Sequence, residues 1–193
     1  MRERLWSGND SARTSLDVLL QVKSGASCHN DLVTNRQPTT PDAQPDPARF
    51  PALWPMQTRW ADNDHYGHVN NVTYYSYFDS AVNGWLMATT GVDIRELEAL
   101  GVVAETSCRY LAELSFPDRL QVGIAVDRLG TRSITYQLAI FREGTDGTLT
   151  PAATGRFVHV YVDARTRRPV PIPDEIRKAV IQLVKGAPER PGP

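Results

Sequence analysis

Cysteines, long apolar runs and excess charge of either sign are all scarce in this chain. Its 193 residues include two cysteines, and 21 Lys and Arg nearly balance 22 Asp and Glu, for a formal net charge of −1. A balanced charge provides no basic field to attract nucleic acid or an anionic membrane. No stretch approaches the roughly 18 apolar residues of a membrane-spanning helix. We therefore expect a cytoplasmic protein with no nucleic-acid or membrane partner, in which local charges hold any anionic ligand.

The two cysteines lie in different surroundings. Cys28 is in a polar segment and Cys108 in an apolar run, and neither belongs to a CxxC pattern or to a metal-ligand spacing. Free thiols of this kind are typical of the cytosol. We expect no disulfide and no cysteine-bound metal.

The composition changes near residue 50. Before that point apolar side chains are few, and a proline-rich string, QPTTPDAQPDPARF, occupies Gln37–Phe50. Such a segment cannot bury enough apolar surface to offset the entropy lost on ordering. Arginines and serines near the start are typical of a transit peptide, but acidic residues in the same stretch argue against one. We expect residues 1–50 to be a disordered or mis-started extension, 51–186 a single domain, and 187–193 a flexible tail.

A long amphipathic helix is predicted from about Val72 to Thr90. Large apolar residues recur there at steps of three and four, namely Tyr74, Tyr77, Phe78, Ala81, Val82 and Trp85. Asn70 or Asn71 provides an N-cap, and Gly91 suits the left-handed position that ends many helices.

Period-two alternation on either side of this helix predicts strands. The predicted strands are Met56–Trp60, Val102–Tyr110, Leu120–Val126, Ile134–Ile140 and Phe157–Val162. A short helix follows Pro173 and ends at Gly186. One long helix with several antiparallel strands indicates the α+β class.

The stretch Asp62–Asp79 carries a recognisable pattern, D-x-D-x-x-G-H-V-N-N-x-x-Y-x-x-Y-F-D. Through it the sequence resembles the 4-hydroxybenzoyl-CoA thioesterase family of hotdog-fold proteins, over roughly residues 56–184. The resemblance implies a hotdog fold, in which an antiparallel sheet wraps around a long central helix. It also implies hydrolysis of an acyl-CoA thioester without a cofactor or a metal.

Thioester hydrolysis needs a nucleophile or base at the carbonyl carbon and hydrogen-bond donors where negative charge develops on oxygen. Asp64 lies about seven residues before the helix, whose first N–H groups are unpaired and whose dipole is positive at that end. The resemblance implies that Asp64 is the catalytic carboxylate, acting as nucleophile or as general base. It also implies that the Asn71 N–H polarises the carbonyl. Gly67 allows a sharp turn and a close approach of the backbone to the substrate.

Other residues of the motif have two readings. His68 is either a general acid or base, since its reference pKa of about 6.5 permits it, or a packing residue. Asp62 is expected to hydrogen-bond loop amides. Tyr74, one turn into the helix, is a candidate for the acyl pocket, and Asn70 a candidate for substrate binding. His65 stays unassigned.

Basic residues elsewhere are candidates for holding the CoA phosphates. Arg132 and Ser133 occupy a strand start where the family places a basic residue and a serine, although an exposed arginine at such a place is often only solubilising. A second basic cluster, Arg165 to Arg168, has the same two readings. Glu105 and Asp79 are the alternative catalytic acids.

A lone hotdog sheet leaves a long edge uncovered, so we expect a homodimer or homotetramer with the active site at the interface. Arg132 would then act on the thioester held by the other subunit. The function indicated is acyl-CoA hydrolysis. Release of acyl chains from a carrier protein, dehydration of a β-hydroxyacyl chain and non-catalytic acyl-CoA binding remain alternatives.

Overall fold

The computed structural model describes residues 44–184, and the structural statements below concern this part of the chain. The strands and helices are β1 (Ala52–Gln57), α1 (Thr73–Thr90), β2 (Ala99–Tyr110), β3 (Arg119–Leu129), β4 (Ser133–Glu143), β5 (Leu149–Asp163) and α2 (Asp174–Val180). Three 3-10 turns accompany them, η1 (Pro47–Arg49), η2 (Trp60–Asp62) and η3 (Ile181–Leu183).

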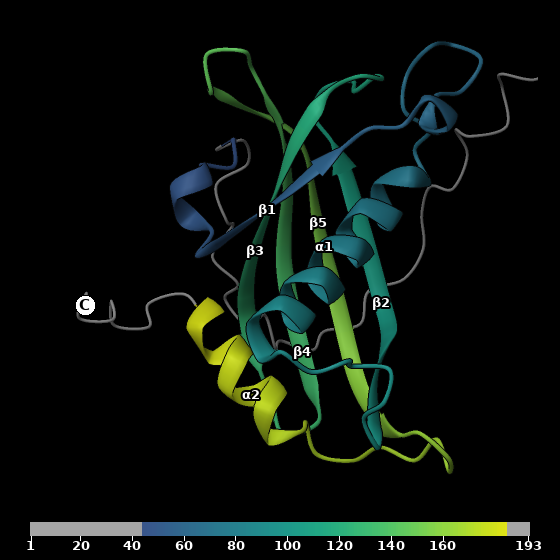
Figure 1. Ribbon diagram of the computed structural model, residues 1–193, viewed down its shortest axis with the longest axis vertical. Coiled ribbons are helices and arrows are strands. Elements are labelled where there is room, and N and C mark those ends of the chain that lie inside the picture. The colour runs from purple at the N-terminus through teal and green to yellow at the C-terminus, as the bar shows by residue number, and fades with distance from the viewer. Residues whose placement is uncertain (1–43, 185–193) are drawn as a thin grey trace, which may run out of the picture. The chain divides into compact units, whose positions relative to one another are not determined.

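The five strands form one antiparallel sheet in the order β1-β3-β4-β5-β2, and α1 crosses one face of it (Figure 1). The α2 helix packs against α1 near the end of the sheet where β3 turns into β4. One sheet wrapped along one long helix is the hotdog arrangement. The predicted α+β hotdog fold is therefore confirmed.

Two strand boundaries were predicted wrongly. The first strand is Ala52–Gln57 rather than Met56–Trp60, and Trp60 begins the η2 turn. Pro55 hid this strand from the sequence pattern, because proline is tolerated in a strand only at an edge or a bulge, and β1 is an edge. The β5 strand starts at Leu149, well before the predicted Phe157, because its first half pairs with β4.

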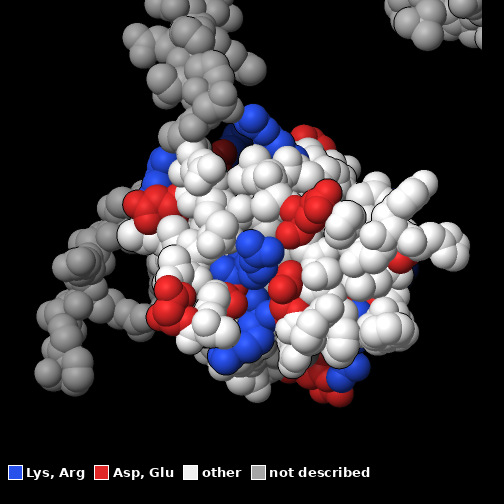
Figure 2. All heavy atoms as spheres, turned by 90° about the horizontal axis from the view of Figure 1, so that it is seen from above, with Lys and Arg blue, Asp and Glu red and all other residues white. Residues whose placement is uncertain are grey.

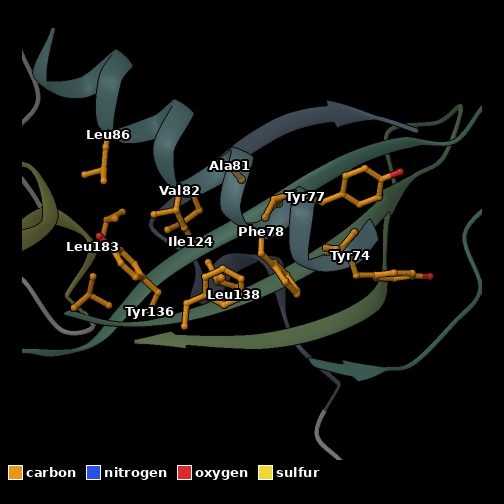
Figure 3. Close-up of a cluster of buried hydrophobic side chains, with 14 of the residues drawn as sticks. Tyr74, Tyr77, Phe78, Ala81, Val82, Leu86, Ile124, Tyr136, Leu138 and Leu183 are labelled. Carbon is orange, nitrogen blue, oxygen red and sulfur yellow. The ribbon is translucent and has the colours of Figure 1, made fainter. Parts of the chain in front are cut away.

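The predicted apolar face of α1 is buried against the sheet (Figure 3). Phe78, Ala81 and Val82 have no exposed surface, and Phe78 lies directly over β5. A methyl group added at Gly155 of β5 would sit 2.6 Å from Cε2 of Phe78. Helix and sheet can approach this closely only because position 155 carries no side chain.

Both ends of α1 are close to their prediction. Val72 directly precedes the helix, and its N–H donates to Oδ1 of Asn70 at 3.1 Å. The predicted N-cap was therefore wrong: Val72 occupies the N-cap position without a side-chain hydrogen bond, and Asn70 stabilises the turn just before it. Gly91 ends the helix with a φ of 70°, and its N–H donates to the carbonyl oxygen of Met87 at 2.9 Å.

Packing begins before the predicted boundary at residue 51. Asp46 caps the η1 turn, and Phe50 is buried against Phe141 with their ring centroids 5.7 Å apart. Phe50 lies over Gly123, where a Cβ would come within 2.6 Å of the Phe50 ring. The remainder of the predicted extension, Cys28 and the predicted tail 187–193 lie outside the described residues.

The strand order leaves β2 at one edge of the sheet, with β5 as its only neighbour. From Gly101 to Tyr110 every residue of β2 is exposed except Cys108, whose thiol is free and half-buried. Val103 and Tyr110 are large side chains of this edge with 45% and 44% of their surface exposed. A long edge strand with exposed apolar residues is available to pair with another chain.

Candidate active site at the start of the central helix

The residues between η2 and α1 form a tight hairpin that carries Asp64. Asn63 and Val69 pair as an antiparallel bridge at its base. Within it the Asp64 N–H donates to the His68 carbonyl at 2.8 Å, and the Gly67 N–H donates to the Asp64 carbonyl at 3.1 Å. Gly67 has a φ of 85°, in the region that favours glycine, and this residue closes the turn. The backbone around Asp64 is therefore held by its own hydrogen bonds.

The Asp64 side chain is half-exposed and lightly engaged. Its Oδ1 accepts the Tyr66 N–H at 2.8 Å, and Asp64 forms no ion pair within residues 44–184. A carboxylate held through one oxygen keeps the other available to a ligand or a water molecule.

Asp62, two residues earlier, has the opposite character. It is 3% exposed, and its carboxylate accepts the Arg59 N–H at 2.6 Å, the Arg59 guanidinium at 2.8 Å and the Tyr77 hydroxyl at 2.6 Å. Burial on its own would raise the pKa of Asp62, but the hydrogen bonds from Arg59 and Tyr77 outweigh burial and lower it. Burial, assisted by the Asp62 carboxylate, raises the pKa of Tyr77, so the phenol stays protonated and donates. Asp62 thus joins the loop to α1, in agreement with the structural role predicted for it.

The backbone N–H of Asn71 is open at the helix start. Asn71 has an exposed position, and its N–H has no acceptor within the described residues. Its carbonyl oxygen accepts the Tyr110 hydroxyl at 3.0 Å, which ties the helix start to the end of β2. Burial raises the pKa of Tyr110 to about 12, so this donor also keeps its proton.

A cavity of about 330 Å³ lies beside this helix start. Its lining includes His68, Asn71 and Tyr74 from the loop and α1, and Tyr110 and Glu113 from the end of β2 and the segment after it. The Tyr74 and Tyr110 rings meet edge to face with centroids 5.0 Å apart. His68 Nε2 lies 3.1 Å from a carboxylate oxygen of Glu113. Three predicted site residues therefore share one cavity, whereas Asp64 is not among the residues that line it.

Comparison with known proteins assigns this arrangement to a family. The model of the thioesterase-like superfamily matches residues 58–180, which include the Asp64 hairpin, α1 and the sheet from β2 to β5. The chain belongs to the thioesterase-like superfamily.

Solved structures agree with this membership. The PA5185 protein of Pseudomonas aeruginosa strain PAO1 is 46% identical over 76% of this chain and 100% of its own, with a TM-score of 0.70. The PA2801 protein of the same species, a proposed thioesterase, is 29% identical over 68% of this chain and 98% of its own, with a TM-score of 0.61. The 1,4-dihydroxy-2-naphthoyl-CoA thioesterase Slr0204 from Synechocystis has a TM-score of 0.61 at 17% identity, over 68% of this chain and 96% of its own, and shares the fold.

Other predicted site residues of this thioesterase-like chain lie far from the helix start. Arg132 is in the connection from β3 to β4 and Ser133 begins β4, at the opposite end of the sheet (Figure 1). Arg132 is exposed there, and its carbonyl accepts the Tyr161 N–H at 2.8 Å. Arg165 and Arg168 occupy an exposed turn at that same end. Within one chain these basic residues are not brought together with Asp64.

The two alternative acids have surroundings of their own. Glu105 is exposed on β2 and forms an ion pair with Arg156 of β5. Asp79 is exposed on α1, and its charge acts on the buried His159. Neither acid lies at a helix start.

Charge at the helix-start end of the molecule is mixed. On the face seen in Figure 2, acidic and basic side chains lie next to one another within a largely uncharged surface. Arg119 and Glu143 form an ion pair of 3.1 Å between β3 and β4.

Residues 44–184 contain no group of three His, Cys, Asp or Glu side chains suited to a metal ion. No helix in that range is long and apolar enough to cross a membrane.

Sequence reasoning missed Tyr110 and His159. Both residues lie in predicted strands. The alternation of a strand predicts which side chains are buried, but it does not predict which residues of other elements they contact. Tyr110 reaches the helix start, and His159 lies in the core beneath α1. No local signal distinguishes them from other aromatic strand residues.

Proposed function

We propose that this protein is an acyl-CoA thioesterase that hydrolyses an acyl thioester to a free acid and CoA. One observation carries the proposal. A helix start with an open backbone N–H at Asn71 borders a cavity and is preceded, seven residues earlier, by a lightly engaged carboxylate at Asp64. Membership of the thioesterase-like superfamily supports the same chemistry.

In the proposed reaction the thioester carbonyl oxygen accepts the Asn71 N–H. The positive end of the α1 dipole then favours the negative charge that develops on this oxygen. Asp64 either attacks the carbonyl carbon, forming a mixed anhydride that water then hydrolyses to the free acid and Asp64, or removes a proton from a water molecule that attacks the carbon directly. The carbon–sulfur bond breaks, and the CoA thiolate leaves and takes up a proton. His68 lines the same cavity and is our candidate for carrying that proton.

The substrate-binding residues complete this proposal. Tyr74 lies in the cavity wall where the acyl group would enter, and the Asn70 side chain supports the loop by accepting the Val72 N–H just before α1. Arg132 and Ser133 are assigned to the CoA phosphates or pantetheine of a substrate held by a second subunit. This assignment requires a dimer, because both residues lie at the far end of their own sheet from Asp64.

The dimer proposed here pairs two β2 strands edge to edge. A twofold axis makes the paired strands antiparallel, so the Tyr110 end of one β2 meets the Ala99 end of the other. The helix start of each subunit then adjoins the end of the partner sheet that carries Arg132.

Thiol release from a panel of acyl-CoAs tests the catalytic proposal. Asp64→Asn and Asp64→Ala should each reduce kcat by about 10²- to 10⁴-fold, because both remove the nucleophile or base. His65→Ala, which changes the exposed neighbour, serves as the matched control and should retain activity. Circular dichroism checks that every variant is folded.

A full rate in Asp64→Asn would overturn the role of Asp64 and direct attention to Asp79→Asn and Glu105→Gln. Absence of turnover by folded wild-type protein on every acyl-CoA would overturn the CoA substrate. The same panel on carrier-protein thioesters, and a hydration assay on a β-hydroxyacyl thioester, would then distinguish the alternatives.

A further inference from the structure

A second cavity, of about 340 Å³, lies at the other end of α1 from the Asp64 hairpin. Its walls come from the C-terminal half of α1, the segment after it, the first residues of β2, the second half of β5, and α2. Apolar side chains dominate the lining and include Leu86, Met87, Ile94, Leu97 and Ile176. A largely apolar cavity with few polar groups is the usual form of a site for an uncharged organic group.

One polar side chain in this wall lacks a partner. His159 of β5 is only 2% exposed, and its Nε2 is buried with no hydrogen-bond partner within residues 44–184. Its ring meets the Tyr136 ring edge to face with centroids 5.1 Å apart, and it is tilted against the Phe157 ring with centroids 6.2 Å apart. Buried polar side chains are nearly always hydrogen-bonded, so an unpartnered one calls for a specific explanation.

The backbone passes close to His159 on the cavity side. A Cβ added at Gly101 of β2, another lining residue, would lie 3.6 Å from Nδ1 of His159 and 3.3 Å from the Tyr161 hydroxyl oxygen. The absence of a side chain at position 101 therefore leaves room beside His159.

Burial lowers the pKa of His159, and the charge of Asp79 opposes this shift only in part. The imidazole is neutral near pH 7 and offers one N–H donor and one acceptor nitrogen. A hydroxyl group both donates and accepts, so it can pair with either nitrogen of either tautomer.

This cavity can hold part of the substrate only in the dimer proposed above, in which it lies next to the partner's helix start. Antiparallel pairing of the β2 edges brings the Ala99 end of one strand to the Tyr110 end of the other. Leu100 and Val102 line the present cavity, and Tyr110 lines the cavity at the helix start. The cavity of one subunit would thus continue the helix-start cavity of its partner.

We infer that this cavity holds the distal part of the acyl chain and that His159 hydrogen-bonds a hydroxyl group there, so that the protein selects hydroxylated acyl chains over plain ones. The inference rests on the proposed function for its link to the thioester. It assigns His159 a role in specificity and none in bond breaking.

Binding of two CoA thioethers, which cannot be hydrolysed, tests the inference directly. Isothermal titration compares S-hexyl-CoA with its ω-hydroxy counterpart on the wild-type protein. We expect the hydroxylated ligand to bind about fivefold to tenfold more tightly, the usual effect of one added neutral hydrogen bond. His159→Phe should abolish this ratio, and His159→Gln, which keeps a donor and an acceptor, should preserve part of it.

Met87→Leu is the matched control, because it changes the cavity wall without changing a polar group, and it should keep the wild-type ratio. If His159→Phe does not fold, His159→Leu replaces it. Equal binding of the two thioethers to wild type, binding of neither, or a ratio that survives in the folded apolar variant would overturn the inference.

Turnover measured separately distinguishes this inference from the proposed function. Hydrolysis of acyl-CoAs without a preference for the hydroxylated thioether would leave the thioesterase intact and overturn the role of His159. A preference without hydrolysis would support the role of His159 and overturn the proposed reaction.

Discussion

At the scale of single residues, two acids two positions apart in the motif have opposite surroundings. Asp62 is buried, and its carboxylate accepts hydrogen bonds from Arg59 and Tyr77. The Asp64 carboxylate is half-exposed and accepts a single hydrogen bond. A carboxylate whose lone pairs are filled by the protein is a poor nucleophile, and one with an open oxygen is available for chemistry. The difference favours Asp64 for catalysis and gives Asp62 a measurable role in stability.

Tyr77→Phe tests that stabilising role. The change removes one hydrogen bond to the buried Asp62 carboxylate and should lower the free energy of unfolding by about 1.5 to 3 kcal/mol. Urea unfolding followed by circular dichroism measures it. Tyr66→Phe is the comparison, because it removes a hydroxyl from a tyrosine that is 86% exposed, and it should change stability much less. Equal losses in the two variants would contradict the contribution of the Asp62 hydrogen bond.

The same carboxylate predicts a dependence of stability on pH. The folded-state pKa of Asp62 lies below its unfolded value of about 3.9, so folding favours the ionised form. Its contribution is therefore complete above the unfolded pKa and is lost as the pH falls through the folded pKa. The difference in unfolding free energy between wild type and Asp62→Asn should be constant from pH 7 to about 5 and shrink below pH 4. A difference that stays constant down to pH 3 would contradict this.

At the scale of secondary-structure elements, the close contact between α1 and β5 depends on Gly155. Position 155 has space for no side chain under Phe78, since an added Cβ would lie 2.6 Å from the ring. Leu138 of β4 and Phe157 of β5 flank this contact in the same core (Figure 3 shows Leu138 and Phe78). Gly155 thus sets the distance between α1 and β5 at Phe78.

Gly155→Ala should destabilise the fold by about 1 to 3 kcal/mol, the usual effect of overpacking a core. Thermal unfolding of the variant measures this. Adding Phe78→Leu shortens the opposing side chain and should recover part of the loss, so the double variant should be more stable than the sum of the single changes implies. Additive losses would show that the two positions do not interact.

At the scale of the whole molecule, the exposed β2 edge is where a second copy is expected. The proposed pairing would cover Val103 and Tyr110 and would bring each helix start to the partner's basic end. In solution the wild-type protein should have about twice the 21.5 kDa mass of one chain, or a higher even multiple if dimers associate further.

Val103→Lys tests this edge. A lysine on the edge strand repels its symmetry mate and should shift the protein toward the monomer mass in size-exclusion chromatography with light scattering. It should also lower thioesterase activity, because the proposed site needs both subunits. Ile181→Lys is the control, since Ile181 is an equally apolar residue, 55% exposed in η3 away from β2, and should leave the mass unchanged. A monomeric wild type with full activity would contradict the interface.

Much of this protein was predictable from the sequence, because periodicity and short-range chemistry are local properties. The face of α1, the glycine at its end, the α+β class and the hotdog resemblance all follow from residues near one another in the chain. The first strand was misplaced because Pro55 breaks the usual pattern, and only pairing with β3 reveals that β1 is an edge.

What the tertiary structure alone decided concerns contacts between distant residues. The Tyr77 hydroxyl donates to Asp62, 15 positions away in the sequence. The Tyr110 hydroxyl donates to the Asn71 carbonyl, 39 positions away. Arg132 is placed at the far end of the sheet from Asp64, and Nε2 of His159 is left without a protein partner beneath α1. Such relations depend on how sheet and helix pack, and packing is a property of the whole fold rather than of any local stretch of sequence.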